Sequence, residues 1–312
     1  MQALIDVILP VFLVIGFGYA AAWFGLISEG AIDGLMKFAQ GFAVPVLLFR
    51  SMAVLDLGAH FDMGLLAAFY IGALAGYAAG YLGARHIFGR PPQDAVAIGF
   101  CSLFSNSLLL GLPITERAYG TEALAGNFAI ISLHAPMLYA FGITAMEWAR
   151  SREAPVSGLA LTRQIGTGIM SNPLVIGIAL GVGWNLAGLP LTGALEQASE
   201  MVARSALPAA LFGLGGVLVR YRPEGDMRTI AMVVAISLVL HPSITWALGR
   251  FAFDLDTGQM RSAVITAGMA PGVNAYLFAN MYGRARRVAA SSVLIATAGT
   301  ILTAWLWIAV LP

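Results

Sequence analysis

The chain has 312 residues, of which 59% are hydrophobic and 11% are charged, and its formal net charge is +1. Soluble globular domains carry about 25% charged residues, so this composition argues against a soluble protein and predicts a polytopic membrane protein. The small net charge gives no sign of a nucleic-acid partner. The single cysteine, Cys101, excludes an intrachain disulfide and a multi-cysteine metal site.

Apolar runs long enough to cross a bilayer as a helix, which takes about 20 residues, recur along the whole chain. The first run has no basic segment before it and no clear cleavage site after it, so we interpret it as a retained span rather than a signal peptide. The ten expected spans are 4–24, 33–54, 63–84, 95–115, 125–147, 171–189, 201–219, 229–249, 262–283 and 288–311.

The basic residues predict the orientation of these spans. Loops after odd-numbered spans hold 12 of the 17 Lys and Arg residues, and loops after even-numbered spans hold the other 5. Because basic loops stay in the cytoplasm, we expect both termini outside and the longest loop, about 148–170, inside. This predicts an integral multi-pass protein of the plasma membrane, which is the inner membrane in a bacterium.

The second half of the chain repeats the first. Eleven residues from Pro45 and eleven from Pro208 share Pro, Leu, Phe, Val and Leu at a constant offset of 163. With five spans in each repeat, the second repeat enters the membrane from the opposite side. Inverted repeats of this kind occur in secondary transporters, which bind substrate near the bilayer midplane. The expected divisions are a first repeat at 1–150, a cytoplasmic linker at 151–170 and a second repeat at 171–312.

Spans four and nine lose their apolar pattern at mid-depth. Asn106 lies eleven residues into span four between two serines, and Asn274 lies about twelve residues into span nine. At 1.5 Å per residue both lie about 16–18 Å deep, near the middle of a ~30 Å core. An offset of 168 superposes the two asparagines, which suggests that they are equivalent in the two repeats.

Pro271-Gly272 should interrupt span nine, because proline lacks an N–H donor and clashes with the preceding turn. The half-helix that starts there has free N–H groups and the positive end of its dipole, which suit a carboxylate. The alternative is an ordinary proline kink, with each Asn bonded to a neighbouring helix. Pro113 is a second expected break, although it does not align with Pro271. The expected substrate site comprises Ser105, Asn106, Ser107, Pro271, Gly272, Val273 and Asn274.

Two titratable residues are candidates for proton transfer. His134 lies mid-span beside Pro136, where it could bond substrate, carry a proton, or be a neutral side chain bonded to a backbone carbonyl. Asp62, at the outer start of span three, is the second candidate, and the simpler reading is a solvated helix end. No Asp or Glu occurs in spans four and nine, so nothing favours a sodium site, and we expect no metal or cofactor.

The segments Ser105-Asn106-Ser107 with Gly111-Leu112-Pro113, and Pro271-Gly-Val-Asn-Ala-Tyr276, resemble those of the auxin efflux carrier family, which includes plant PIN carriers and bacterial malate and malonate permeases. Pro45 and Phe49 resemble the family's second helix. The resemblance covers the whole chain and implies an all-α fold similar to bile-acid symporters and sodium/proton antiporters, in which the broken spans four and nine cross.

The same resemblance implies that the spans form two domains with different roles. Spans three to five and eight to ten would form a transport domain, which moves as an elevator against a dimeric scaffold of spans one, two, six and seven. The substrate carboxylate would lie near Asn106 and Asn274, with Pro45 and Phe49 lining the pocket. The long cytoplasmic loop of many plant members is reduced here to about twenty residues, which is typical of a minimal bacterial carrier.

The leading hypothesis is a secondary carrier of a small organic carboxylate, such as an auxin-like monocarboxylate, malate or malonate, driven by the membrane potential. One alternative is a proton- or sodium-coupled importer on the same fold, in which His134 or Asp62 titrates. A passive channel is another alternative. A hydrolase using Ser105, Ser107 and His134 is the last, without a Gly-x-Ser-x-Gly or His-Glu-x-x-His motif in support. Expected partners are the organic acid, membrane lipids and a second copy of the chain.

Overall fold

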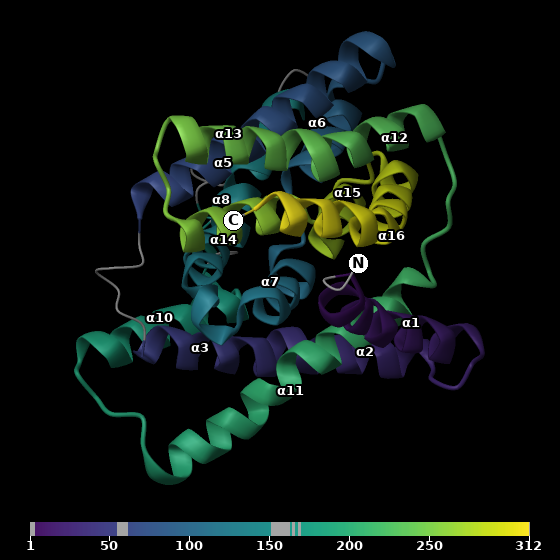
Figure 1. Cartoon of the computed structure of the whole chain (residues 1–312). Coiled ribbons are helices and arrows are strands. Elements are labelled where there is room, and N and C mark those ends of the chain that lie inside the picture. Colours follow the sequence, from purple (N-terminus) through teal and green to yellow (C-terminus); the bar gives the residue numbers. More distant parts are fainter. Residues whose placement is uncertain (1–3, 55–61, 151–162, 164–165, 168–169, 312) are drawn as a thin grey trace. The chain divides into compact units, whose positions relative to one another are not determined.

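A computed structural model describes residues 4–54, 62–150, 163, 166–167 and 170–311 (Figure 1). These residues are helical almost throughout, and the β pairing among them is one isolated antiparallel bridge between Ser105 and Pro271. The protein is therefore all-α, as the sequence predicts. The linker expected at 151–170 lies outside the described residues, apart from residues 163, 166–167 and 170.

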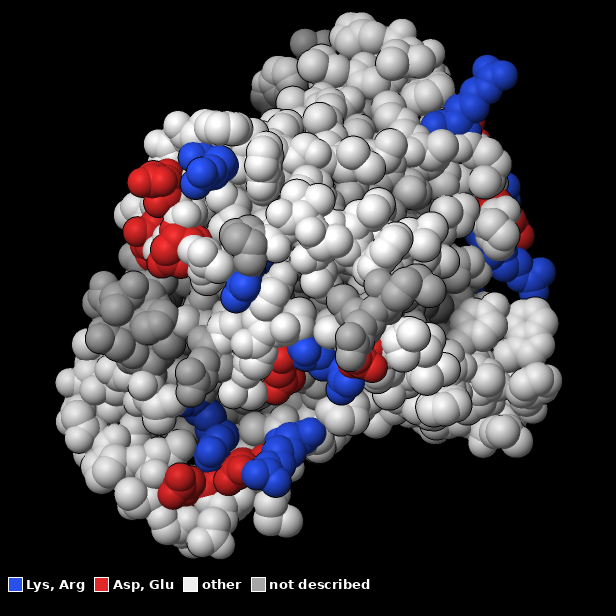
Figure 2. All heavy atoms as spheres, viewed as in Figure 1, with Lys and Arg blue, Asp and Glu red and all other residues white. Residues whose placement is uncertain are grey.

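Seven helical runs within the described residues are long and apolar enough to cross a membrane. Figure 2 shows that the charged side chains on one face gather in small groups and leave wide uncharged areas between them. Both observations are consistent with a multi-pass membrane protein. The seven runs are Ile5–Trp23, Glu29–Val54, Met63–Ile87, Ala125–Arg150, Gly193–Leu218, Met227–Phe251 and Arg286–Val310, and Pro173–Leu186 is a shorter apolar helix.

The described helices belong to two compact units, each of which combines parts of both halves of the sequence. Unit 2 comprises Pro10–Phe61 and Gly166–Arg220, and unit 1 comprises Met1–Leu9, Asp62–Ile165 and Tyr221–Pro312. In unit 2 the helices are α1 (Leu9–Trp23), α2 (Glu29–Phe38), η2 (Ala39–Ala43), α3 (Val44–Val54), α10 (Pro173–Leu186) and α11 (Gly193–Leu218).

Unit 1 holds the remaining helices, and α12 and α13 run on through η6 as one rod (Figure 1). They are η1 (Leu4–Ile8), α5 (Met63–Leu82), η3 (Gly83–Ile87), α6 (Pro92–Leu103), η4 (Ser107–Gly111), α7 (Leu112–Tyr119), η5 (Thr121–Leu124), α8 (Ala125–Arg150), α12 (Met227–Ala235), η6 (Ile236–Leu240), α13 (His241–Phe251), α14 (Thr257–Ala267), α15 (Val273–Met281) and α16 (Arg286–Val310).

Glycines let the helices of unit 2 approach closely. A Cβ at Gly181 of α10 would lie 2.5 Å from the Phe49 carbonyl oxygen on α3, and a Cβ at Gly177 would meet the backbone of Pro45. Such distances are too short for a side chain, so only glycine fits at this contact. Because Gly177 and Gly181 are four residues apart, they lie on one face of α10, and this face packs tightly against α3.

Gly72, Gly76 and Gly80 of α5 allow close helix packing in unit 1 as well. A Cβ at Gly72 would lie 2.5 Å from Thr245 Oγ1 of α13, and one at Gly76 would lie 2.9 Å from the Ser102 carbonyl oxygen of α6. Gly80 also faces Ser102. Helix α5 is thus held against α13 and α6, and α6 leads directly into the interrupted region of the first half.

The ranges 95–115 and 262–283, each expected as one span, are both interrupted. Helix α6 ends at Leu103 and helical structure resumes at Ser107, while α14 ends at Ala267 and α15 begins at Val273. The interruption at Pro271-Gly272 agrees with the prediction from proline chemistry. The other interruption has no proline in it.

Pro113 does not break a helix, which corrects the prediction made for it. The helical run continues from η4 into α7, and Pro113 lies in the first turn of α7, where a missing N–H costs little. Four π-helical turns, η1, η2, η4 and η6, each end two residues before a proline. Because a π turn accommodates an extra residue, it gives the backbone room where proline removes a hydrogen bond.

Candidate functional site at the crossover of the two interrupted helices

The two interruptions in unit 1, residues 104–106 and 268–272, pair with each other through their backbones, and we call this paired region the crossover. The Asn106 N–H donates to the Ala270 carbonyl oxygen at 2.8 Å, and the Gly272 N–H donates to the Phe104 carbonyl oxygen at 2.9 Å. Broken helices are tolerated in a membrane only where protein or water satisfies the freed groups, and here each segment satisfies the other.

This bridge fixes which residues correspond locally. Since Ser105 lies opposite Pro271, the two segments superpose with an offset of 166, and Asn106 then corresponds to Gly272. Both are the N-cap residues of the half-helices that follow them. The offset of 168, which equates Asn106 with Asn274, is therefore wrong by two residues at the crossover.

The N-terminus of the helix after the first interruption is closed. Asn106 is buried and its Oδ1 accepts a hydrogen bond from the Leu109 N–H at 3.2 Å, which caps the helix end. Ser105 and Ser107 are buried as well. Among the described residues, Asn106 Nδ2 and Ser105 Oγ have no hydrogen-bond partner. Both atoms are buried inside unit 1, so neither is openly accessible.

His134 of α8 bonds the backbone of the same segment. Its Nε2 lies 3.0 Å from the Ser105 carbonyl oxygen, and because a carbonyl can only accept, Nε2 carries the proton. The ring packs edge-on against Phe104 with centroids 4.6 Å apart. The bond goes to the serine backbone rather than to Ser105 Oγ, so this geometry contains no nucleophile–base pair.

The N-terminus of α15 is open. Val273 and Asn274 are partly exposed, whereas Pro271 and Gly272 are buried. Within the described part of the chain, neither the Val273 N–H nor the Asn274 N–H has a backbone acceptor. Two free donors and the positive end of the helix dipole therefore meet at an accessible position, which is an arrangement suited to an anion.

Tyr139 of α8 lies beside this open end. Its hydroxyl group is 3.3 Å from the Asn274 carbonyl oxygen and 3.4 Å from Asn274 Oδ1. With the amide oxygen turned toward the tyrosine, the amide N–H groups of Asn274 are left as donors. Sequence reasoning did not single out Tyr139, since a tyrosine in an apolar span is more often a packing residue.

The crossover is electrically neutral apart from backbone dipoles. Residues 95–115 and 262–283 contain no Asp, Glu, Lys or Arg. The described residues also contain no cluster of three His, Cys, Asp or Glu side chains that could hold a metal ion. An anion bound here would meet hydrogen-bond donors rather than a fixed positive charge.

The sequence profile of the membrane transport protein family matches residues 3–308. The chain belongs to this family. It is the auxin efflux carrier family that the motifs around Asn106 and Asn274 resemble, and the assignment makes the protein a membrane transporter rather than an enzyme.

Three curated relatives illustrate the range of this family. A Rhizobium meliloti protein named as a proposed malonate transporter is 23% identical over 309 residues, which cover 97% of this chain and 94% of that protein. Auxin efflux carrier component 5 of Arabidopsis thaliana is 20% identical over 315 residues, covering 89% and 88%. The lysosomal cholesterol signaling protein of Mus musculus is 25% identical over 251 residues; the match covers 76% of this chain but only 29% of the mouse protein.

The other candidate residues, Asp62, Pro45 and Phe49, have contacts of their own within their units. Asp62 caps α5, since its Oδ1 accepts from the Leu65 N–H at 2.8 Å, as expected for a helix-end residue. Pro45 and Phe49 lie on α3 in unit 2, where the Phe49 ring is edge-on to Trp184 at 5.8 Å. Their predicted place in a substrate pocket stays a prediction.

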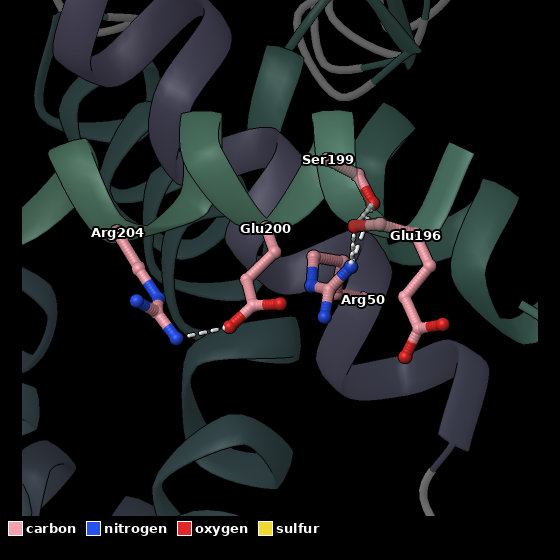
Figure 3. A network of polar contacts seen from close by, with 5 residues as sticks. All are labelled: Arg50, Glu196, Ser199, Glu200 and Arg204. Carbon is pink, nitrogen blue, oxygen red and sulfur yellow. Dashed lines mark hydrogen bonds and ion pairs between the residues drawn. The ribbon is translucent and has the colours of Figure 1, made fainter. Parts of the chain in front are cut away.

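A polar contact also fixes α3 within unit 2. Figure 3 shows Arg50 of α3 reaching α11, where its Nη1 donates to the Glu196 carbonyl oxygen and to Ser199 Oγ, both at 2.7 Å. Glu200 and Arg204 form an ion pair one turn further along α11. Helix α3 is thus tied to α11 by side-chain bonds and to α10 by glycine packing.

Proposed function

We propose that this transporter carries a small organic carboxylate anion, bound at the open N-terminus of α15. One observation carries the proposal: at a partly exposed helix end, the Val273 and Asn274 N–H groups have no backbone acceptor among the residues that the structure describes. A carboxylate oxygen could accept from both, and the Asn274 amide could donate to the second oxygen. Malonate and auxin, which the names of the relatives mention, both present a carboxylate.

The neutral crossover favours a monoanion over a dianion. No Lys or Arg in the interrupted segments would neutralise a second carboxylate, and helix dipoles supply only about half an elementary charge. A carrier that moves one net negative charge exploits the membrane potential directly, which contributes about 2.3 kcal/mol per 100 mV. Export from a cell with a negative interior then needs no coupling ion.

We further propose that the chain forms ten spans as two inverted repeats, with both termini outside the bacterial inner membrane. Unit 1 would be the transport domain and unit 2 the scaffold, which would also mediate dimerisation. The way in which the helices divide supports this proposal, because each unit collects helices from both halves of the chain. The local two-fold pairing of Ser105 with Pro271 supports an inverted repeat.

Proton coupling is the rival reading, and the hydrogen bonds weigh against its two candidates. His134 Nε2 already donates to a backbone carbonyl, and Asp62 already caps a helix. Each group therefore has a structural task that does not require titration.

Thermal stabilisation of the purified protein by a panel of carboxylates tests the proposed site. Malonate, malate, succinate, lactate, indole-3-acetate and short-chain acids are compared, since a ligand at 100 times its Kd stabilises by about 2.7 kcal/mol. The stabilisation should weaken in Asn274→Ala, which removes the side-chain amide donor and keeps both backbone N–H groups. It should persist in Asn280→Ala, which changes an exposed asparagine on the same helix. Equal stabilisation of Asn274→Ala and the unmodified protein would contradict the site.

A further inference from the structure

The backbone of the second interruption makes a hydrogen bond to α16 in addition to the bridge between Ser105 and Pro271. The Ala270 N–H donates to Thr300 Oγ1 of α16 at 3.2 Å, and both residues are fully buried. The same hydroxyl group donates to the Ala296 carbonyl oxygen at 2.9 Å. A hydroxyl group has one proton, so donation to Ala296 leaves its lone pairs for Ala270.

Ala270 connects the Thr300 hydroxyl group to the crossover through two hydrogen bonds. While its N–H is held by Thr300, its carbonyl oxygen accepts from the Asn106 N–H at 2.8 Å. One residue thus connects α16 to the first interruption, three and four residues before the open N–H groups of Val273 and Asn274. On the other segment, His134 of α8 plays the comparable part by donating to the Ser105 carbonyl oxygen.

Thr297 shows that this arrangement is specific to one threonine. It lies one turn earlier on α16 and is also buried, and its hydroxyl group donates to the Val293 carbonyl oxygen at 2.6 Å. This is the usual bond of a threonine to its own helix. Within the described residues the Thr297 hydroxyl makes no hydrogen bond to the crossover, so Thr297 is a matched control for Thr300.

We propose that Thr300 is a positioning residue of the substrate site, which acts through Ala270 on the N-terminus of α15. The proposal rests on the proposed function, because the groups that it positions are the donors assigned there to the carboxylate. Removing the hydroxyl leaves the Ala270 N–H buried without an acceptor, so the segment moves to find another. A displacement of about 1 Å at a binding site can cost up to a hundredfold in rate.

Hydrogen–deuterium exchange of the protein in lipid nanodiscs tests the hydrogen bond from Ala270 to Thr300 without any substrate. In Thr300→Val, the amides of the peptide covering residues 268–276 should exchange at least about tenfold faster than in the unmodified protein. Thr300→Ser should restore protection, and Thr297→Val should leave it unchanged. Equal protection of this peptide in Thr300→Val and Thr297→Val would overturn the proposal.

Uptake of radiolabelled malonate and indole-3-acetate into proteoliposomes tests the consequence for transport. Thr300→Val should raise KM about ten- to a hundredfold, with Thr300→Ser and Thr297→Val within about twofold of the unmodified protein. An unchanged KM in Thr300→Val would overturn the positioning role. Failure of the unmodified protein to transport either acid would instead count against the proposed substrate class, and the exchange comparison would still decide the role of Thr300.

Discussion

His134 illustrates how a buried polar side chain can serve backbone geometry. A histidine within an apolar span is a functional candidate by default, because burying an ionisable group is costly. Its partner, the Ser105 carbonyl oxygen, is 29 residues away in the sequence and belongs to an interruption that contains no proline. The sequence therefore identifies the residue but not its bond, which depends on where the helix ends.

Replacing His134 by Gln separates positioning from proton transfer. The Gln amide N–H can replace Nε2–H as the donor to Ser105, but it does not titrate. We expect His134→Gln to keep the pH profile of transport, with a rate within about twofold, and His134→Phe to lose about 1–3 kcal/mol of stability through the unpaired carbonyl group. Uptake measured from pH 5 to 8 checks this. A profile that becomes flat in His134→Gln would identify a proton carrier instead.

At the scale of elements, the predictable features follow from local backbone chemistry. Pro271-Gly272 predicts an interruption because the lost donor and the steric clash act within one turn. Pro113 misleads because a π turn precedes it and the helix continues through it. The equivalence of Asn106 with Asn274 misleads too, since the register at the crossover is set by hydrogen bonds between distant segments rather than by residue identity.

The packing of α10 on α3 can be tested with two glycines on one helix. A Cβ at Gly181 would lie 2.5 Å from the Phe49 carbonyl oxygen and 2.7 Å from Met52 Cβ, whereas a Cβ at Gly183 would meet nothing within 4 Å. We expect Gly181→Ala to destabilise the protein by about 1–3 kcal/mol through overpacking. Gly183→Ala should be neutral or stabilising by up to about 1 kcal/mol, since alanine favours a helix. Denaturation midpoints of both variants, measured in detergent, test this expectation. Equal midpoints for the two variants would contradict this packing.

Asp226, the N-cap of α12, lies outside the membrane spans, and its contacts predict that the stability of the fold depends on pH. Its carboxylate accepts from the Thr229 hydroxyl at 2.7 Å and pairs with Arg90 at 2.9 Å. The Thr229 hydroxyl, and then the Arg90 guanidinium, lower the pKa of Asp226 below its usual value. A carboxylate with a lowered pKa stabilises the fold above its unfolded pKa of about 4, and this contribution is lost as the pH falls through the folded value.

We therefore expect Asp226→Asn, which keeps a capping oxygen, to melt below the unmodified protein at pH 7. The difference should shrink as the pH falls below about 4, because both proteins then carry a neutral group at this position. Melting temperatures measured at pH 7, 5 and 3 check this. A difference that persists unchanged at pH 3 would mean that the charge is not its cause.

At the scale of the whole molecule, the question is what drives transport. The sequence shows that the crossover contains no Asp, Glu, Lys or Arg. It does not show how many protons or other ions move with each substrate anion. An uncoupled carrier of a monoanion moves one negative charge per cycle, whereas a carrier that takes one proton with the same anion moves none. The two mechanisms therefore respond differently to the same membrane potential.

Equilibrium distribution in proteoliposomes measures this difference without requiring a uniform orientation of the protein. With a valinomycin-clamped potential of about 100 mV, negative inside, an uncoupled monoanion should reach an internal concentration roughly fiftyfold below the external one, since 2.3 kcal/mol is about 1.7 powers of ten. We expect this result at equal pH on both sides, with protein-free liposomes as the control. A distribution that ignores the potential and follows an imposed pH gradient would assign proton coupling, and the neutral crossover would then need a titrating partner elsewhere in the chain.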